Sequence, residues 1–199
     1  MPTTITDVRD RIRKDLHDTD AANYRWSDAQ LDRHIDHALS ELSAAMPQEK
    51  TYQAATTPGS RDISLATLSG LVDIEAVEYP LGEFPPAYNG FSTWAGLLTL
   101  HVDTAPAGAD AKVYYTARHQ LDVAGTTLSA FQADVLVTGA SAYAAFEQSA
   151  FTVDRVTMGE AVAGGYAAYG RARLTAFRQL LLQYGRANRV RGRRTFVPA

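Results

Sequence analysis

The sequence predicts an α+β protein. Helices from the N- and C-terminal parts form one bundle, a small antiparallel β domain is inserted between them, and an extended arm ends the chain. Three observations carry this prediction: helical periodicity in both outer parts, short β-rich runs separated by glycine and proline in the middle, and an aperiodic arginine-rich terminus. We place the N-terminal helices in residues 1–49, the β domain in 50–124, the C-terminal helices in 125–185 and the basic arm in 186–199.

The first helix is indicated by an apolar stripe whose members recur at steps of three and four: Ile5, Val8, Ile12 and Leu16. Thr4 and Asp7 are a plausible capping pair at its start. The opposite face, which includes Arg9 and Arg13, mixes acids and bases. We expect that face to be solvated or to meet another subunit.

The second helix carries the clearest local pattern in the chain. Ser27 and Gln30 form a capping box, and Trp26 and Leu31 form the hydrophobic staple that accompanies it. Apolar residues on one face then predict a helix over 28–46. Trp26 and Leu31 are therefore expected to be structural residues.

Residues 50 to 122 change character, because glycine and proline cluster between short β-rich runs. Four runs are predicted to be strands: Asp62–Leu65, Leu71–Tyr79, Gly96–Val102 and Lys112–Ala117. The segment Ala105–Asp110 has the composition of a hairpin-like turn, and we expect it to join the last two of these strands. The region is thus predicted to be a small antiparallel β unit.

Two more helices are predicted in the C-terminal part. Ser129 and Gln132 repeat the capping box and open a helix over about 130–150, in which small residues let another helix approach closely. A break is expected near Thr152–Thr157. The final helix should then run to about Tyr184, followed by a glycine that suits a helix end.

Charge is divided unevenly along the chain. Residues 171–199 contain eight arginines and no lysine, aspartate or glutamate, whereas the preceding 170 residues hold 11 basic and 22 acidic side chains. Such asymmetry indicates a terminal arm that binds an anionic partner. The candidates are a nucleic acid, an acidic protein surface and the acidic body of a neighbouring copy. Arginine binds carboxylates as well as phosphates in a bidentate manner. The predicted partner-binding residues are Arg186, Arg189, Arg191, Arg193 and Arg194, with Phe196 and Val197 as an apolar plug.

Four aromatic residues surround a segment rich in proline and glycine: Phe84, Tyr88, Phe91 and Trp94. They can stack bases or sugars, anchor a long loop as a mini-core, or form an interface loop that meets another protein. We favour the mini-core and keep the interface loop as a candidate binding site.

No catalytic motif is recognisable. The sequence has no P-loop, no H-E-x-x-H motif, no G-x-S-x-G motif and no cysteine. His34 and His37 have a spacing that can hold a metal, but they flank the apolar stripe of their helix, so we predict no metal site. We also predict no catalytic residue, no cofactor and no enzymatic activity. The N-terminal residues lack the apolar region of a signal peptide, and no run of ~18 apolar residues predicts a membrane span.

The segment Tyr24–Ala38, which begins Tyr-Arg-Trp-Ser-Asp-Ala-Gln-Leu, resembles the N-terminal region of head–tail connector (adaptor) proteins of tailed bacteriophages. In those proteins an early helix is followed by a Trp-Ser/Thr-Asp-x-x-Leu turn that opens the second helix. The Ala-rich helix Val135–Phe146 and the basic C-terminal arm are similar too, so the resemblance covers mainly residues 4–46 and 128–199. The β insert departs from it, because minimal adaptors are almost wholly helical and only larger ones carry an insertion.

The resemblance implies a structural protein of the virion neck, made in the host cytoplasm. It implies a ring, commonly of twelve copies, that docks beneath the portal protein through its C-terminal arm and meets a downstream stopper or tail-completion protein. DNA would pass through the central channel without sequence-specific binding, because an acidic lumen repels phosphate. The alternative is a nucleic-acid-binding protein that uses the arginine-rich tail on DNA or RNA.

Overall fold

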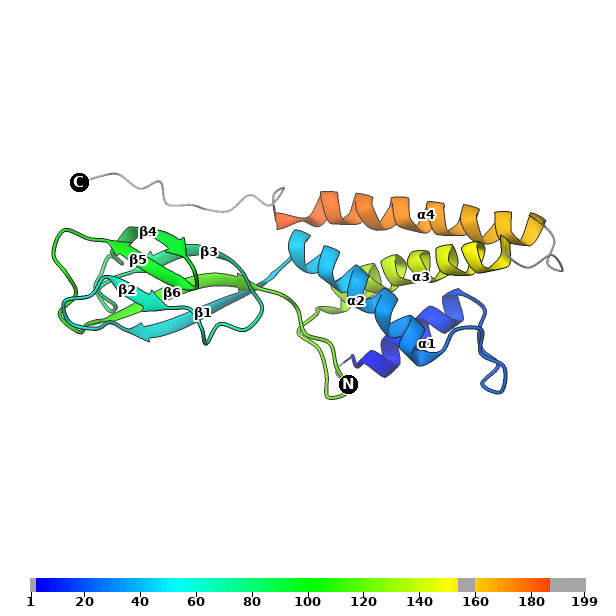
Figure 1. Ribbon diagram of the computed structural model, residues 1–199, viewed down its shortest axis with the longest axis horizontal. Coiled ribbons are helices and arrows are strands. Elements are labelled where there is room, and N and C mark those ends of the chain that lie inside the picture. Colours follow the sequence, from blue (N-terminus) through cyan, green and yellow to red (C-terminus); the bar gives the residue numbers. More distant parts are fainter. Residues whose placement is uncertain (1–2, 154–159, 187–199) are drawn as a thin grey trace. The chain divides into compact units, whose positions relative to one another are not determined.

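The computed structural model of the chain describes residues 3–153 and 160–186, which divide into two compact units (Figure 1). The helical unit combines the described residues of Met1–Met46 and Gln120–Ala199, and the β unit is Pro47–His119. The α+β class predicted from the sequence is confirmed, with helices from both outer parts in one unit and an antiparallel sheet inserted between them.

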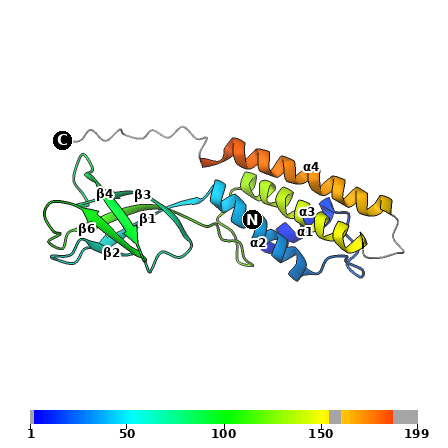
Figure 2. The same ribbon diagram turned by 45° about the horizontal axis from the view of Figure 1, so that its top comes forward.

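The helical unit contains α1 (Ile5–Asp15), α2 (Asp28–Ala45), α3 (Ala130–Val153) and α4 (Glu160–Tyr184). α3 and α4 run side by side in both views, and α3 also packs against α1 and α2 (Figure 1, Figure 2). These helices enclose one apolar core. Its largest fully buried side chains are Trp26, Phe177, Ile12, Leu31, Leu42 and Leu136.

The predicted capping boxes start the first three helices. Ser27 accepts the Gln30 N–H at its Oγ (3.3 Å), and Gln30 accepts the Ser27 N–H at its Oε1 (2.8 Å). The same reciprocal pairs form at Thr4 with Asp7 and at Ser129 with Gln132. Each box satisfies backbone donors that the first helical turn leaves without intrahelical acceptors.

Glycine lets α3 and α4 approach each other closely, as the small residues of α3 predicted. A Cβ at Gly139 would lie 2.9 Å from ring carbons of Phe177, and one at Gly170 would lie 3.2 Å from a backbone oxygen of α3. The adjacent Gly164 and Gly165 differ, because no heavy atom lies within 4 Å of the position that their Cβ would take. Packing within the chain therefore explains the first two glycines but not the second two.

The β unit is one antiparallel sheet with the strand order β1-β6-β3-β4-β5-β2. The strands are β1 (Gln48–Ala55), β2 (Asp62–Ser64), β3 (Leu71–Glu78), β4 (Tyr88–Trp94), β5 (Leu97–His101) and β6 (Asp110–Ala117). β4 pairs with β3 only at Tyr88 and Asn89, and then pairs with β5 from Gly90 to Trp94. This change of partner curls the sheet around its own core, whose most buried members include Val77, Leu98, Leu100, Ala111 and Val113.

The prediction that β5 and β6 form a hairpin is wrong. These strands are not neighbours, because β3 and β4 lie between them in the sheet. The connecting segment is instead held by the β1–β2 connection: Gly59 donates its N–H to the Pro106 carbonyl (2.8 Å), and Thr56 Oγ1 donates to the Ala109 carbonyl (2.6 Å). Proline and glycine reverse the chain there, but long-range pairing decides which strands meet.

Two strands are absent from the sequence prediction. β1 alternates between half-buried and exposed residues and is rich in polar side chains, so its β propensity is weak. β4 contains Asn89-Gly90, a pair typical of turns, yet both residues lie within the strand. A Cβ at Gly90 would make an ordinary van der Waals contact with the His101 ring across the sheet, at 3.5 Å, so packing does not require a glycine there.

The α3–α4 contact gives a stability prediction. Gly139→Ala should lower the free energy of unfolding of the helical unit by about 2 kcal/mol, because the new methyl group overlaps the Phe177 ring. Gly164→Ala is the matched control and should raise it by up to about 1 kcal/mol, since it adds helix propensity in open space. Urea unfolding followed by circular dichroism measures both. Equal stability of the two variants would contradict this packing.

Candidate interaction sites

The predicted arm can be placed only at its beginning. Arg186 is half-buried and is separated from the end of α4 only by Gly185. The other predicted arm residues lie outside the described ranges: Arg189, Arg191, Arg193, Arg194, Phe196 and Val197.

Three of the eight C-terminal arginines belong to α4 and have different surroundings. Arg173 forms an ion pair with Asp15 and donates its Nε–H to the hydroxyl of Tyr169 (2.9 Å). Arg178 is exposed and lies near Tyr143, whose pKa it lowers slightly against the larger effects of burial and of Glu41. Arg171 is exposed. Arg173 thus has a structural role within the unit, whereas Arg171 and Arg178 present positive charge on the surface.

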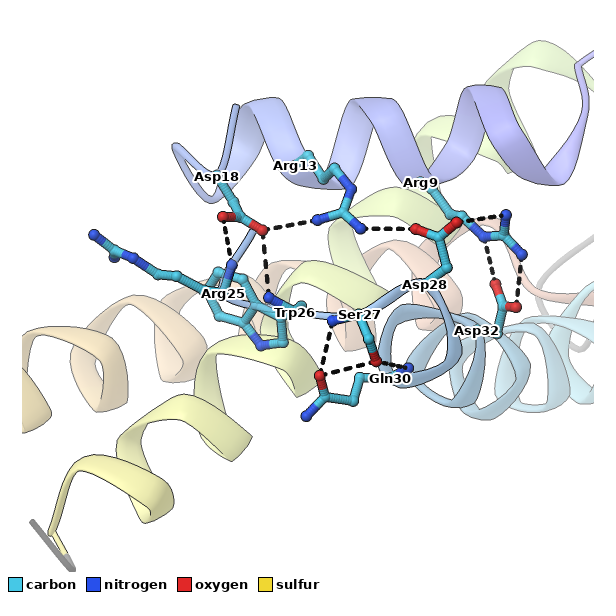
Figure 3. Close-up of polar contacts among 9 residues, drawn as sticks. All are labelled: Arg9, Arg13, Asp18, Arg25, Trp26, Ser27, Asp28, Gln30 and Asp32. Atoms are coloured by element: carbon cyan, nitrogen blue, oxygen red, sulfur yellow. Dashed lines mark hydrogen bonds and ion pairs between the residues drawn. The ribbon is translucent and has the colours of Figure 1, made fainter. Parts of the chain in front are cut away.

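A buried ion pair joins α1 to the loop that precedes α2. The Arg13 and Asp18 side chains are 5% and 3% exposed, and Arg13 Nη1 lies 2.8 Å from Asp18 Oδ2 (Figure 3). Arg13 also contacts Asp28 Oδ1 through Nη2 (2.8 Å) and lies over the ring of Tyr24 at 3.6 Å. The expectation of a solvated face is therefore wrong for Arg13. The spacing of residues within one helix cannot reveal that Asp18 of the following loop and Asp28 of α2 both contact Arg13.

The Asp18 carboxylate also holds the backbone of residues 25–28, here called the Trp26 turn. Asp18 accepts the backbone N–H of Arg25 (2.9 Å) and that of Trp26 (3.4 Å), as Figure 3 shows. The Trp26 side chain is 1% exposed and donates its Nε1–H to the Ala144 carbonyl of α3 (3.2 Å). Trp26 is thus structural, as predicted, and so is the fully buried Leu31.

A bidentate ion pair adds a second connection between α1 and α2. Arg9 Nε contacts Asp32 Oδ1 and Arg9 Nη2 contacts Asp32 Oδ2, both at 2.7 Å. Arg9 also lies 3.3 Å from Asp28, so that Asp28 connects Arg9 with Arg13 (Figure 3). The Trp-Ser-Asp turn is consequently held by charged groups on one side and by the core on the other.

His34 and His37 take part in helix packing. His34 is buried, and its Nε2 lies 2.6 Å from Glu147 Oε2 of α3. Burial lowers the pKa of His34 below its ordinary value, against the opposing effect of the Glu147 carboxylate. His37 stacks on the ring of Tyr143 at 4.2 Å and lies 3.3 Å from Glu41. Among the described residues, no group of three or more His, Cys, Asp and Glu side chains is arranged to hold a metal.

The four aromatic residues around the Pro/Gly segment do not form a mini-core, so that favoured interpretation is wrong. Phe84 and Trp94 are 95% and 86% exposed. Phe91 packs against the sheet core, and the Tyr88 ring lies 6.0 Å from the ring of Tyr114. Tyr88, Phe91 and Trp94 are spread along the strand 88–94, and Phe84 lies outside it. Only Phe84 and Trp94 remain as candidates for an interface.

The helical unit also has a pocket that the sequence did not reveal. Its volume is about 390 Å³, and its walls include Leu16, Arg25, Val162, Gly165, Tyr166 and Tyr169. These residues come from the end of α1, the loop before α2 and the first half of α4. Sequence patterns show no trace of such a pocket, because its walls meet only after the helices pack.

Comparison with known proteins does not assign the chain to a family. No family model matches the chain, and none of the curated proteins is significantly similar to it. None of the helices in the described ranges combines the length and apolar composition needed to span a bilayer. The functional assignment therefore depends on the residues themselves.

The buried ion pair gives a second stability prediction. Asp18→Asn should lower the free energy of unfolding of the helical unit by about 3 kcal/mol, because it leaves Arg13 buried without its main counter-charge. Asp10→Asn, at an exposed carboxylate of α1, is the control and should change it by less than about 0.5 kcal/mol. Urea unfolding followed by circular dichroism tests both. A loss at position 18 no larger than that at position 10 would contradict the assigned role.

The His34–Glu147 pair predicts a pH dependence. The folded state disfavours protonated His34, so the wild-type free energy of unfolding should fall as the pH drops below about 6.5, the ordinary pKa of histidine. His34→Gln should reduce the fall measured between pH 7.5 and pH 5.5. Glu147 contributes only at lower pH, because its pKa is lowered from 4.5. An unchanged slope in His34→Gln would refute the prediction.

Proposed function

We propose that this protein is a structural head–tail connector (adaptor) of a tailed-phage virion. Copies of the chain would form a ring in the neck, beneath the portal protein, and DNA would pass through the ring to the tail without sequence-specific binding. A stopper or tail-completion protein would bind on the downstream side. In this proposal the protein has no catalytic role and needs no cofactor.

The Trp26 turn is the observation that carries the proposal. Its Trp-Ser-Asp-x-x-Leu pattern is the part of the sequence that resembles adaptors, and in this chain Trp26 is buried between the helices that contain the rest of the resemblance. α1 and α2 are joined there by Arg13, Asp18 and Asp28, and α3 supplies the acceptor for the indole N–H. The described residues of the resembling segments thus belong to one packed unit.

The division of charge supports the same function. The first 170 residues hold twice as many acidic as basic side chains, and carboxylates around a channel let DNA slide because they repel phosphate. The arginines from 186 onward suit bidentate contacts with carboxylates on a portal protein. Phe196 and Val197 would then add an apolar anchor, as central apolar residues do in other interfaces.

Removal of the arm tests this assignment. A chain that ends after Gly185 should keep the circular dichroism spectrum of the full chain but lose capture by the purified portal protein, because the docking residues are missing. Capture is measured by affinity pull-down at fixed salt, with the full chain as reference. Undiminished capture of the truncated chain would show that the arm is not the docking element.

Free DNA separates this function from nucleic-acid binding, which the exposed Arg171 and Arg178 also favour. If the arm docks on protein, excess duplex DNA should leave portal capture nearly unchanged. If the arm is a nucleic-acid ligand, DNA should bind tightly, with an affinity that falls steeply with salt, and should compete for the arm. Salt alone does not separate the two, because both contacts are electrostatic.

A further inference from the structure

A solvent-exposed tryptophan, Trp94, lies at the turn between β4 and β5. Trp94 pairs with Leu97 across a two-residue turn, and both turn residues have positive φ, 49° at Ala95 and 77° at Gly96. Positive φ at both central positions is the hallmark of tight type I′ hairpin turns, which match the twist of their strands. Trp94 is 86% exposed and Leu97 is 43% exposed. The four residues Trp94–Leu97, here called the Trp94 tip, therefore present an indole on a short, defined support.

The two sequence segments that meet at the Trp94 tip carry no charge. The ten-residue segments 63–72 and 91–100 contain no Asp, Glu, Lys or Arg, although a fifth of the chain is charged. They meet at the turn, where the Leu65 N–H donates to the Gly96 carbonyl (2.9 Å). Depletion of charge around an exposed aromatic residue is typical of the centre of a protein interface. Phe84 is exposed as well, but it follows Glu83 and lies outside these segments.

The pocket of the helical unit has complementary chemistry. The hydroxyl of Tyr166 accepts from Arg25, and that of Tyr169 donates to the Asp15 carbonyl (3.2 Å) and accepts from Arg173. Since the hydroxyls of both tyrosines already have partners, the tyrosines offer a ligand mainly ring surface, beside the Val162 side chain. Asp15, His17 and Arg25 also line the pocket. The guanidinium of Arg25 adds a cation that attracts the face of an aromatic ring. A volume of about 390 Å³ accommodates one indole.

We propose that Trp94 of one copy inserts into this pocket on the next copy. This inference rests on the proposed ring and names the contact that helps to close it. Two different surfaces of the chain meet in such a contact, so it is heterologous and can repeat around a ring. A second copy fits better than nucleic acid, because the Trp94 tip has no cation for phosphate and the pocket includes the Asp15 carboxylate.

Two pairs of variants of the full chain test the contact. Trp94→Ala removes the inserted side chain, and Phe84→Ala, at the other exposed aromatic residue, is its control. Gly165→Leu fills the pocket, and Gly164→Leu is its control, because both glycines face open space but only Gly165 lines the pocket. At both positions the new Cβ has no neighbour within 4 Å, and both substitutions raise helix propensity equally.

Sedimentation over a range of protein concentrations gives the association constant. Acrylamide quenching of fluorescence reports the environment of the two tryptophans, and Trp26, at 1% exposed, is shielded in every folded state. Wild type should associate as its concentration rises, with simultaneous protection of Trp94. Trp94→Ala and Gly165→Leu should each weaken association by about tenfold or more, as loss of an interface hot spot does. Phe84→Ala and Gly164→Leu should behave as wild type.

Three results would overturn the inference. The first is association of Trp94→Ala and Gly165→Leu at wild-type strength. The second is protection of Trp94 in the dilute monomer, which would mean that its own chain covers it. The third is a wild-type protein that stays monomeric, with Trp94 open to acrylamide, at the highest concentration. Portal capture is measured separately, so failure of this contact is distinguishable from failure of the connector function.

Discussion

The helical unit depends on a guanidinium and a carboxylate that share a nearly dry site, Arg13 and Asp18. Charges removed from water are tolerated only where partners satisfy them, and here each has more than one. Arg13 reaches Asp28 and the ring of Tyr24 as well. Asp18 uses its remaining acceptor capacity on two backbone N–H groups of the loop, the second of which belongs to Trp26. The position of the loop backbone is thereby fixed before α2 begins.

Contacts of Trp26 and Arg25 connect this loop to α3 and α4. Trp26 donates an indole hydrogen bond to α3, and its ring lies in a T-shaped contact with that of Tyr166 from α4, with 6.2 Å between the ring centroids. Tyr166 in turn contacts Arg25, the residue whose N–H is held by Asp18. The pocket beside Tyr166 is therefore built on the same residues that fix the helix start.

The β unit has its own core and its own constraint, which is the path of β4. Because this strand leaves β3 after Asn89 and continues along β5, it carries the chain from one half of the curled sheet to the other and ends at the Trp94 tip. The tip is thus the end of a strand paired over five residues, not part of a loose loop. That support is what makes an exposed indole at this position suitable for binding.

The sequence by itself determined the features that rest on local hydrogen bonds and periodicity. The four helices and the capping boxes follow from residues three or four apart, whose contacts form within one helix or one turn. The structural role of Trp26 was indicated by the staple pattern at the same helix start. Only the tertiary structure decided the burial of Arg13, the strand β4 with its turn-like Asn89-Gly90, the separation of β5 from β6 and the pocket beside Tyr166. Each of these depends on groups far apart in the chain, and the free energy of such contacts has no counterpart in local residue spacing.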